Sequence, residues 1–236
     1  MWNSLPTQLY TAEQVRQLDK DIIEKQPIDG YALMCKAAQA AWEECEQRWP
    51  AAETINVFCG TGNNAGDGYV LATLARKAGK TVRVTALADP ETLKGEAQQA
   101  AQDWLAAGGI SEPFDPNRSP EIDDVVVDAL LGTGLDRNVE GQWKQAICWI
   151  NERHGEQVLA LDIPSGLCAN TGAVFGDAVR ATVTITFVGV KLGLSTGYAA
   201  DFRGDLVFAD LGAAALSEAP AAEAERLQMD DFRHWF

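Results

Sequence analysis

Three short segments combine acidic and amide side chains with glycine-rich turns, and each follows an apolar run that is typical of a buried strand. Residues 60–68 read GTGNNAGDG, residues 128–138 read DALLGTGLDRN, and residues 162–166 read DIPSG. Ligands of an open parallel sheet bind beyond the carboxyl ends of its strands, so these segments are expected at the binding edge. If the three strands are neighbours, Asp128, Asp162 and the first loop converge on one crevice.

The first loop has the GxGxxA spacing of a dinucleotide-binding turn, but its polar residues depart from that pattern. A carboxylate at Asp67 would repel a pyrophosphate placed where a Rossmann turn binds one. The loop is therefore expected to do something other than hold a pyrophosphate in the usual manner. The alternative for Asn64 or Asp67 taken alone is a helix cap, which satisfies the first free amides of the following helix.

Asn64, Asp128 and Ser165 together offer oxygen ligands for a hard cation. One carboxylate with neutral oxygens suits a monovalent cation best. Buried like charges are costly unless a cation or ligand offsets them, which favours a ligand site over unrelated turns. The alternative for Ser165 is a tight strand-to-helix turn, in which Pro164 fixes φ and the hydroxyl bonds the local backbone.

Histidine is scarce, so acid–base chemistry is assigned to a carboxylate or a lysine. His154 lies at the end of an expected helix, and His234 lies in the C-terminal tail. The chain has no GxSxG elbow, no Ser-His-Asp order and no Walker loop, which removes most support for hydrolase and kinase functions. Two interpretations stay open for Lys191: it pairs with a phosphate, or it is a solvated loop lysine.

The elements that must position these residues follow a βαβ pattern from residue 54 onward, where short β-branched runs alternate with amphipathic segments. Strands are expected at 54–59, 81–87, 123–128, 157–162, 181–188 and 205–208, and helices near 66–79, 91–107 and 140–154. Because each crossover reads as a helix, the pattern predicts a Rossmann-like, doubly wound, mostly parallel sheet. Helices on both faces would make it a three-layer α/β/α fold.

The length of 236 residues and the apolar content of 47% predict a single domain. Residues 1–53 read as an N-terminal helical extension of that domain, with two helices between Thr11 and Trp49. Residues 54–212 form the expected core. Residues 213–236 read as a tail or linker, although the Ala- and Glu-rich part equally suits a surface helix.

The net charge of −15 disfavours two classes of partner, nucleic acid and anionic membranes. A small anionic ligand stays compatible, because helix N-termini and loop amides bind phosphate locally. The N-terminus has no signal-peptide pattern, and no apolar run reaches about 18 residues, so a cytoplasmic location is expected. The five cysteines are widely spaced and lack a CxxC pair, which predicts buried free thiols in a reducing compartment.

Four motifs taken together resemble the YjeF N-terminal family, the NAD(P)H-hydrate epimerases. They are GTGNNAGDG at 60–68, VDALLGTG at 127–134, LDIPSG at 161–166 and TFVGVKLG at 186–193. The resemblance extends from about residue 11 to 212, and the four motifs in this order are very specific as a set. It implies an isomerase that interconverts the R and S forms of NADH and NADPH hydrated at C6 of the nicotinamide ring, a step of cofactor repair.

Carried over residue by residue, the resemblance implies a substrate site, a potassium site and one catalytic carboxylate. Substrate contacts are expected from Asn63, Asn64, Ala65, Gly66 and Asp67, from Gly132, Thr133, Gly134, Leu135, Asp136, Arg137 and Asn138, and from Asp162. Potassium is expected on Asn64, Asp128 and Ser165. Asp162 is the candidate acid and then base, because the ring nitrogen can expel a protonated C6 hydroxyl and water can return to the opposite face.

Two departures from the family pattern qualify this site. Ala65 stands where many members have glycine, a change that should be tolerated. The segment 33–38 (LMCKAA) lacks the polar residue often found after the methionine, which leaves a role for the N-terminal helices in the site open. Residues 231–236 look like the junction that precedes an ADP-dependent dehydratase domain in bifunctional members, and a homodimer is a further partner to consider.

Two other functions compete with the epimerase. A non-catalytic nucleotide- or RNA-binding dimerisation module has a related fold in the decapping-factor family, but the net charge of −15 and the intact acids disfavour it. A nicotinamide dehydrogenase is ranked lower. The chain lacks a clear ribose-binding acid about 20 residues past the glycines and a histidine for hydride transfer.

Overall fold

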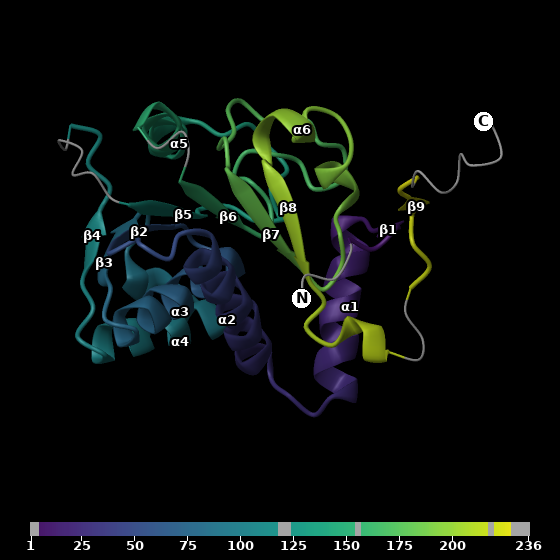
Figure 1. The fold of residues 1–236 in the computed structure, drawn as a ribbon, viewed down its shortest axis with the longest axis horizontal. Helices are drawn as coiled ribbons and strands as arrows, with labels where there is room; N and C mark the ends of the chain where they lie inside the picture. The colour runs from purple at the N-terminus through teal and green to yellow at the C-terminus, as the bar shows by residue number, and fades with distance from the viewer. Residues whose placement is uncertain (1–4, 118–123, 154–156, 217–219, 228–236) are drawn as a thin grey trace.

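A computed structural model of the chain describes residues 5–117, 124–153, 157–216 and 220–227. Its centre is a seven-stranded sheet in the order β4-β3-β2-β5-β6-β7-β8, and every neighbouring pair runs parallel (Figure 1). The strands are β2 Thr54–Cys59, β3 Thr81–Ala86, β4 Ser111–Pro113, β5 Val125–Ala129, β6 Val158–Leu161, β7 Val183–Phe187 and β8 Asp205–Ala209. The predicted parallel sheet is confirmed.

Helices cover both faces of the sheet, as a doubly wound fold requires. One face carries α2 (Gly30–Arg48), α3 (Asn63–Lys77) and α4 (Gly95–Ala106), while α5 (Gly141–Arg153) lies on the other face (Figure 1). The remaining helix of the N-terminal extension, α1 (Ala12–Lys25), lies beyond α2, toward β7 and β8. The three-layer α/β/α class predicted from the sequence is confirmed.

The central strands are apolar on both faces because both faces are covered. Every residue of β5, β6 and β7 is buried. In β5, Val125 and Val127 join the core beneath α2, α3 and α4, whereas Val126 joins the core beneath α5. The strand that carries Asp128 into the site is therefore anchored by apolar contacts on two sides.

The structure corrects the sequence analysis at two connections. The edge strand β4 was not predicted, because it has three residues and ends on a proline, which suits only an edge. The expectation that every crossover is a helix is wrong for residues 162–182, which join β6 to β7 without one. The segment after β7 has only short elements, the 3-10 turn η2 (Leu192–Leu194) and α6 (Ala199–Phe202).

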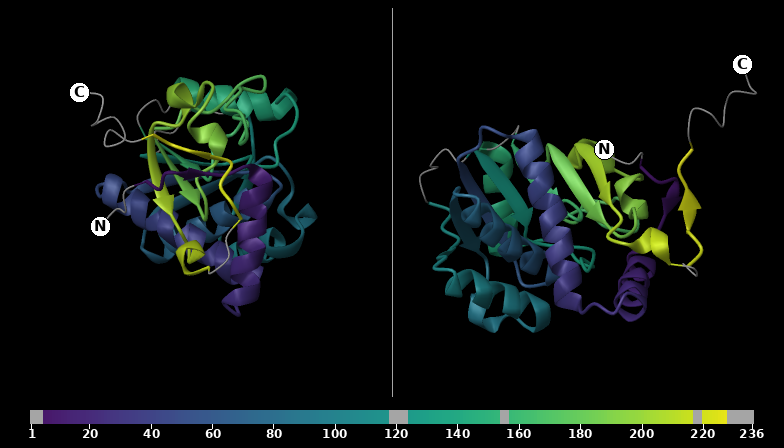
Figure 2. Two further views of the ribbon diagram at one scale, coloured as in Figure 1. Left: turned by 90° about the vertical axis from the view of Figure 1, so that its right-hand side faces the viewer. Right: turned by 60° about the horizontal axis from the view of Figure 1, so that its bottom comes forward.

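The two ends of the described chain pair with each other at the side of α1. Strand β1 (Gln8–Leu9) runs antiparallel to β9 (Ala224–Glu225), which the right-hand view of Figure 2 shows side by side. Where the structure describes the segment predicted as a linker or surface helix, it contains one 3-10 turn, η3 (Ala213–Ala215), before β9. Residues 231–236, His154 and His234 lie outside the described residues.

The structure bears on two expectations, the state of the cysteines and the presence of membrane-spanning helices. All five cysteines are free thiols, as predicted, but only Cys45 and Cys59 are buried, so the prediction of burial is wrong for Cys35, Cys148 and Cys168, which are half-buried. None of the helices among the described residues combines the length and the apolar character needed to cross a bilayer.

Candidate active site

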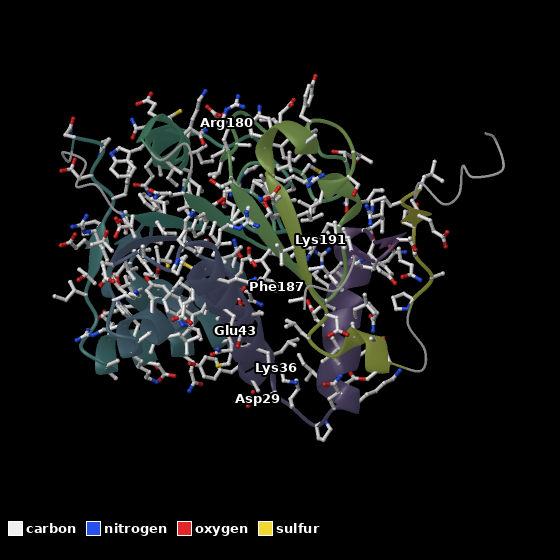
Figure 3. The ribbon with its side chains drawn as sticks, in the orientation of Figure 1. Asp29, Lys36, Glu43, Arg180, Phe187 and Lys191 are labelled. Carbon is white, nitrogen blue, oxygen red and sulfur yellow. The ribbon has the colours of Figure 1, made fainter. Side chains whose placement is uncertain are left out.

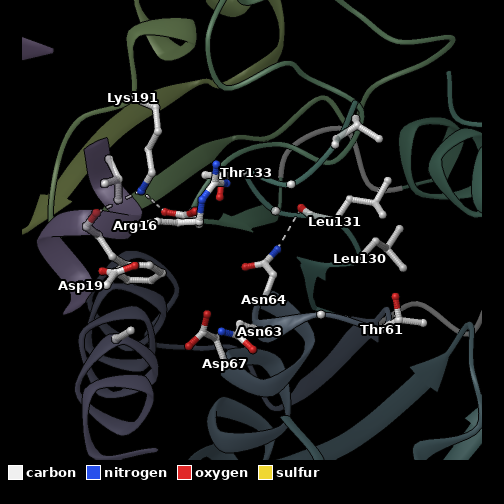
Figure 4. A pocket seen from close by; sticks show the side chains of 18 of the residues that line it. Arg16, Asp19, Thr61, Asn63, Asn64, Asp67, Leu130, Leu131, Thr133 and Lys191 are labelled. Carbon is white, nitrogen blue, oxygen red and sulfur yellow. Dashed lines mark hydrogen bonds and ion pairs between the residues drawn. The ribbon is translucent and has the colours of Figure 1, made fainter. Parts of the chain in front are cut away.

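A cavity of about 940 Å³ opens at the carboxyl ends of the central strands (Figure 4). Its volume is at the upper end of the range for small-molecule sites. Most of the predicted substrate residues line it: Asn63, Asn64, Asp67, Gly132, Thr133, Gly134, Leu135, Asp136, Arg137, Asn138 and Asp162. The segments after β2, β5 and β6 therefore converge on one crevice, as expected for neighbouring parallel strands.

Two predicted contact residues, Ala65 and Gly66, lie behind the cavity wall. Ala65 is fully buried in the core. A Cβ atom at Gly66 would lie 2.6 Å from the Met34 side chain and 3.0 Å from the backbone of Ala97, so glycine lets α3 pack closely against α2 and α4. These two residues position the loop, and the structure places neither of them at the cavity surface.

Helix α3 begins without a side-chain cap. Its N-cap is Gly62, and neither Asn64 nor Asp67 bonds the first amides of the helix. Instead, the Asn64 side chain points across the crevice and donates from Nδ2 to the carbonyl of Leu131 at 3.0 Å. The helix-cap alternative for Asn64 and Asp67 is therefore wrong, and both polar side chains are available to the cavity.

Asp128 and Ser165 form a buried polar pair beneath the cavity. The Ser165 hydroxyl donates to Asp128 Oδ1 at 2.6 Å, and the Ser165 amide donates to Oδ2 at 2.8 Å. Both residues are fully buried. Burial raises the pKa of Asp128 to about 6, against the hydrogen bonds from Ser165, which lower it. The Ser165 hydroxyl bonds distant residues rather than its local backbone, so the turn alternative for Ser165 is wrong.

A cation fits beside the polar pair because one buried amide oxygen there, Oδ1 of Asn64, has no donor in the part of the chain that the structure describes. The Leu131 carbonyl lies within 3.0 Å of Asn64 Nδ2 and 3.2 Å of Ser165 Oγ, so the three predicted ligands adjoin one another. Among the described residues, no hydrogen-bond donor reaches the buried Oδ1 of Asn64. An orphaned amide oxygen beside a fully buried carboxylate is what a monovalent cation would satisfy.

Asp162 directly follows β6 and has a backbone φ of 66°, in the left-handed region. Its carboxylate pairs with the ammonium of Lys191, which follows β7. Lys191 is only 1% exposed and also donates to Thr186 Oγ1 at 3.1 Å and to the Phe187 carbonyl at 3.0 Å. The solvated-lysine interpretation is therefore wrong. An ammonium has three protons, and these three acceptors use all of them. None is left for a phosphate group, with which Lys191 was alternatively expected to pair.

Lys191 lies near α1 (Figure 3), and the segment that carries it is fixed by backbone bonds to Tyr10, two residues before that helix. Tyr10 donates to the carbonyl of Val190 at 2.9 Å and accepts from the amide of Leu192 at 2.8 Å. Strand β7 and the segment before α1 thus hold the lysine from two sides. This pairing joins residues about 180 positions apart, and no local pattern in the sequence indicates it.

The N-terminal helices supply cavity residues that the sequence analysis left open. Arg16 and Asp19 of α1 and Met34 of α2 line the cavity. Burial raises the pKa of Asp19 to about 6; Lys191 lowers it and Asp162 raises it further. Asp19 lies four positions after Val15, on the buried face of α1. An acid within an apolar helical stripe is the signal in the sequence that points to Asp19.

Acidic groups gather at the end of the cavity that contains Asp162. Asp19, Asp67 and Lys191 come from three different elements and surround the same space (Figure 4). Burial, followed by the charges of Asp162 and Asp19, raises the pKa of Asp67 well above its ordinary value. An acidic cluster of this kind favours a ligand that carries or develops positive charge.

The family model described as YjeF-related protein N-terminus matches residues 30–193. The chain is 39% identical over 216 residues to a protein of Bordetella pertussis named NAD(P)H-hydrate epimerase, and the match covers 90% of each. It is 43% identical to a Coxiella burnetii protein and 38% identical to an Escherichia coli protein, both named bifunctional NAD(P)H-hydrate repair enzyme Nnr. These matches cover 87% and 98% of the chain but 42% and 45% of the relatives, so the chain spans less than half of their length.

A solved structure shares the fold. The crystal structure of yeast ynu0, YNL200c, superposes with a TM-score of 0.71 and covers 92% of this chain and 96% of its own. The two sequences are 17% identical, so this similarity concerns the fold alone.

Proposed function

The chain belongs to the YjeF-related N-terminal family, and we propose that it acts as an NAD(P)H-hydrate epimerase, an isomerase of nicotinamide cofactor repair. Its substrates would be NADH and NADPH hydrated at C6 of the nicotinamide ring, in their R and S forms. The observation that carries the proposal is the similarity over 90% of both chains to a protein with that name. The cavity adds independent support through its chemistry.

Epimerisation at C6 passes through a cationic ring, which an acidic cluster can stabilise. Once the C6 hydroxyl is protonated, the lone pair of the ring nitrogen expels it as water and leaves a positive charge on the ring. Asp19 and Asp162 border the cavity at that end, where their side chains can lie close to the charged ring. Preorganised negative charge near a developing cation is a large source of catalysis.

Asp162 is the group proposed to move a proton at the ring. Asp162 lines the cavity, and its carboxylate pairs with the ammonium of Lys191. A carboxylate in that position takes a proton from the water that adds to C6, and returns it when the reaction runs backwards. The role proposed for Lys191 is to fix Asp162 by holding one of its carboxylate oxygens.

The phosphates of the dinucleotide are proposed to bind along the segment 132–138 and the N-terminus of α3. This segment lines the cavity with two glycines, the hydroxyl of Thr133 and the guanidinium group of Arg137. A helix N-terminus and glycine-rich backbone offer amide donors to phosphate oxygens, even on a chain with a net charge of −15. The nicotinamide end would then lie at the acidic end of the cavity.

Potassium is proposed as the cation of Asn64, Asp128 and Ser165. The orphaned Oδ1 of Asn64 and the buried Asp128 support this ligand set. A bound cation would offset the buried carboxylate and fix the three loops that meet there. Because Asp128 and Ser165 lie beneath the cavity wall, their role is to position the loops.

Potassium chloride is expected to raise the melting temperature above that in tetramethylammonium chloride at equal ionic strength, because only potassium fits the site. With potassium at about 100 times its Kd, binding adds about 2.7 kcal/mol, which is roughly 5–10 °C for a domain of this size. Thermal melts of the wild type and of Asn64→Ala provide the measurement and its control. Equal melting temperatures of the wild type in the two salts would contradict a specific site.

The proposed activity is tested by the rate at which the two epimers interconvert. Purified R or S hydrate of NADPH is incubated with and without the protein, and the epimers are separated by chromatography. Spontaneous epimerisation supplies a background, so the comparison is between rates rather than end points. A wild-type rate equal to the background would reject the proposal.

RNA is expected not to bind the chain appreciably, which separates the enzyme from the RNA-binding module. With a net charge of −15, the surface cannot release many counterions from a phosphate backbone. Two titrations at low salt compare a single-stranded RNA with NADPH. Tight RNA binding with a steep salt dependence, together with no binding of the dinucleotide, would favour the scaffold function.

The proposal extends to location and partners. Five free thiols fit a reducing compartment, which supports a cytoplasmic location. The longer relatives named bifunctional repair enzymes support a dehydratase domain fused to this chain in the full-length protein. A homodimer stays a prediction, and gel filtration with light scattering would test it.

A further inference from the structure

Two carboxyl groups in the cavity differ in their partners. Asp162 is held by the buried ammonium of Lys191. Asp67 lines the same cavity from the second turn of α3, and none of the described residues forms a hydrogen bond or an ion pair with its carboxyl group. A carboxyl group that has no protein partner and borders a cavity can bond whatever fills that cavity. This position indicates a group whose partner is the ligand.

The chemistry of epimerisation calls for a second proton-transfer group. The hydroxyl that leaves C6 and the water that replaces it lie on opposite faces of the ring. A ring held in one orientation by its phosphates presents only one of those faces to Asp162. Proton transfer requires hydrogen-bond reach, about 2.6–3.2 Å between heavy atoms, so a single carboxylate cannot serve both faces without turning the ring over.

We propose that Asp67 is a second catalytic residue, a protonated carboxyl group that acts on the face of the ring opposite to Asp162. Asp67 comes from α3 and Asp162 from the end of β6, and both line the one cavity. This inference rests on the proposed epimerase function. It replaces one carboxylate acting twice with two carboxyl groups that each act once.

The surroundings of Asp67 keep its carboxyl group protonated. Burial raises its pKa well above the ordinary value, and the charges of Asp162 and Asp19 raise it further. Lys191 opposes this shift, but its ammonium is already bonded to Asp162, Thr186 and Phe187. The other groups around the same space are Arg16 of α1, Cys35 of α2 and Glu96 of α4.

The step balances in protons and electrons. Asp67 gives its proton to the C6 hydroxyl, the C–O bond breaks, and the nitrogen lone pair forms the C=N bond of the cation as water leaves. A second water adds to the opposite face of C6, its proton passes to Asp162, and the electron pair returns to nitrogen. One water is released and one is consumed. In the reverse reaction Asp162 donates a proton and Asp67 accepts one. After each turnover, proton exchange with water in the open cavity returns the two carboxyl groups to their starting protonation states.

The competing role for Asp67 is a hydrogen bond to a ribose hydroxyl of the substrate. The two roles differ in kinetics, because a ground-state contact changes KM, whereas a proton donor changes kcat. Asp67→Asn keeps the size of the side chain and can still bond a hydroxyl, but it cannot donate an acidic proton. Asp201→Asn is the matched control, since Asp201 is exposed on α6 and does not line the cavity.

The experiment measures kcat, KM and the pH profile of epimerisation, corrected for the spontaneous rate. For Asp67→Asn we expect kcat to fall about 10²-fold or more and KM to change by less than about threefold. The wild-type rate should fall as pH rises and Asp67 ionises, and this basic limb should vanish in Asp67→Asn. Asp201→Asn should keep the wild-type profile.

A second variant separates lost chemistry from lost structure. Asp67→Ala should be as slow as Asp67→Asn, and added imidazole should restore part of its rate, because imidazolium is present near neutral pH and can supply the missing proton. A raised KM with unchanged kcat, or a basic limb retained in Asp67→Asn, would overturn the role of Asp67. An inactive wild type would instead reject the epimerase function itself, so the two failures are distinguishable.

Discussion

Replacing Asp162 with asparagine is expected to lower kcat about 10²- to 10⁴-fold, the usual contribution of a general acid or base. Asparagine fits the site: it has the same size, tolerates the left-handed φ of 66° and can still accept a bond from Lys191. The variant should therefore remain folded. Rates of epimer interconversion, with circular dichroism as the check of the fold, provide the measurement.

The interpretation of Asp162→Asn depends on a comparison with Asp67→Asn. If the two groups act in one concerted cycle, the double variant should be about as slow as the slower single variant, because residues that act as a unit are not additive. Asp201→Asn again controls for the loss of one negative charge. A kcat near that of the wild type in Asp162→Asn would reject Asp162 as the proton carrier.

The fold was predictable because its signals are local. A continuous buried run such as Val125–Ala129 occurs in a parallel strand when helices cover both faces of its sheet. The missed strand β4 has only three residues, too few for a pattern. The connection 162–182 was expected to contain a helix because the other crossovers do, but it reaches β7 through turns alone.

The polar wall of the site was predictable for a different reason. Asn64, Asp128 and Asp162 follow neighbouring strands, and the carboxyl ends of parallel strands meet at one edge. Sequence order does not indicate which distant segment faces this edge. Asp19 reaches the cavity because Tyr10, two residues before α1, pairs with the 190–192 segment, a contact between distant parts of the chain.

The environment of Lys191 illustrates the same limit. A lysine in the motif TFVGVKLG follows a strand and looks like a solvated loop residue. Three acceptors, Asp162, Thr186 and Phe187, come together only when β6 and β7 pair and Asp162 turns into the left-handed region. The lysine is buried because those acceptors satisfy each of its protons, a balance that no spacing rule indicates.

Lys191→Met is expected to destabilise the fold and slow the reaction together. Methionine fills the buried volume but leaves the Phe187 carbonyl and the Asp162 carboxylate without their donor. Breaking a buried ion pair costs about 3–5 kcal/mol of unfolding free energy. Because the Asp162 side chain is 17% exposed, water at the cavity will bring this cost toward the lower end of that range. The melting temperature should fall by roughly 6–12 °C, and kcat should fall about 10²-fold because Asp162 is no longer positioned.

The double variant Lys191→Met with Asp162→Asn distinguishes a positioning role from simple loss of packing. If the ion pair is what the lysine contributes, neutralising Asp162 removes the unpaired charge, and the double variant should be more stable than Lys191→Met alone. Denaturant unfolding of the wild type, both single variants and the double variant measures this coupling. If instead the two losses simply add, Lys191 stabilises the fold independently of Asp162, and its effect on kcat cannot be assigned to the placement of that carboxylate.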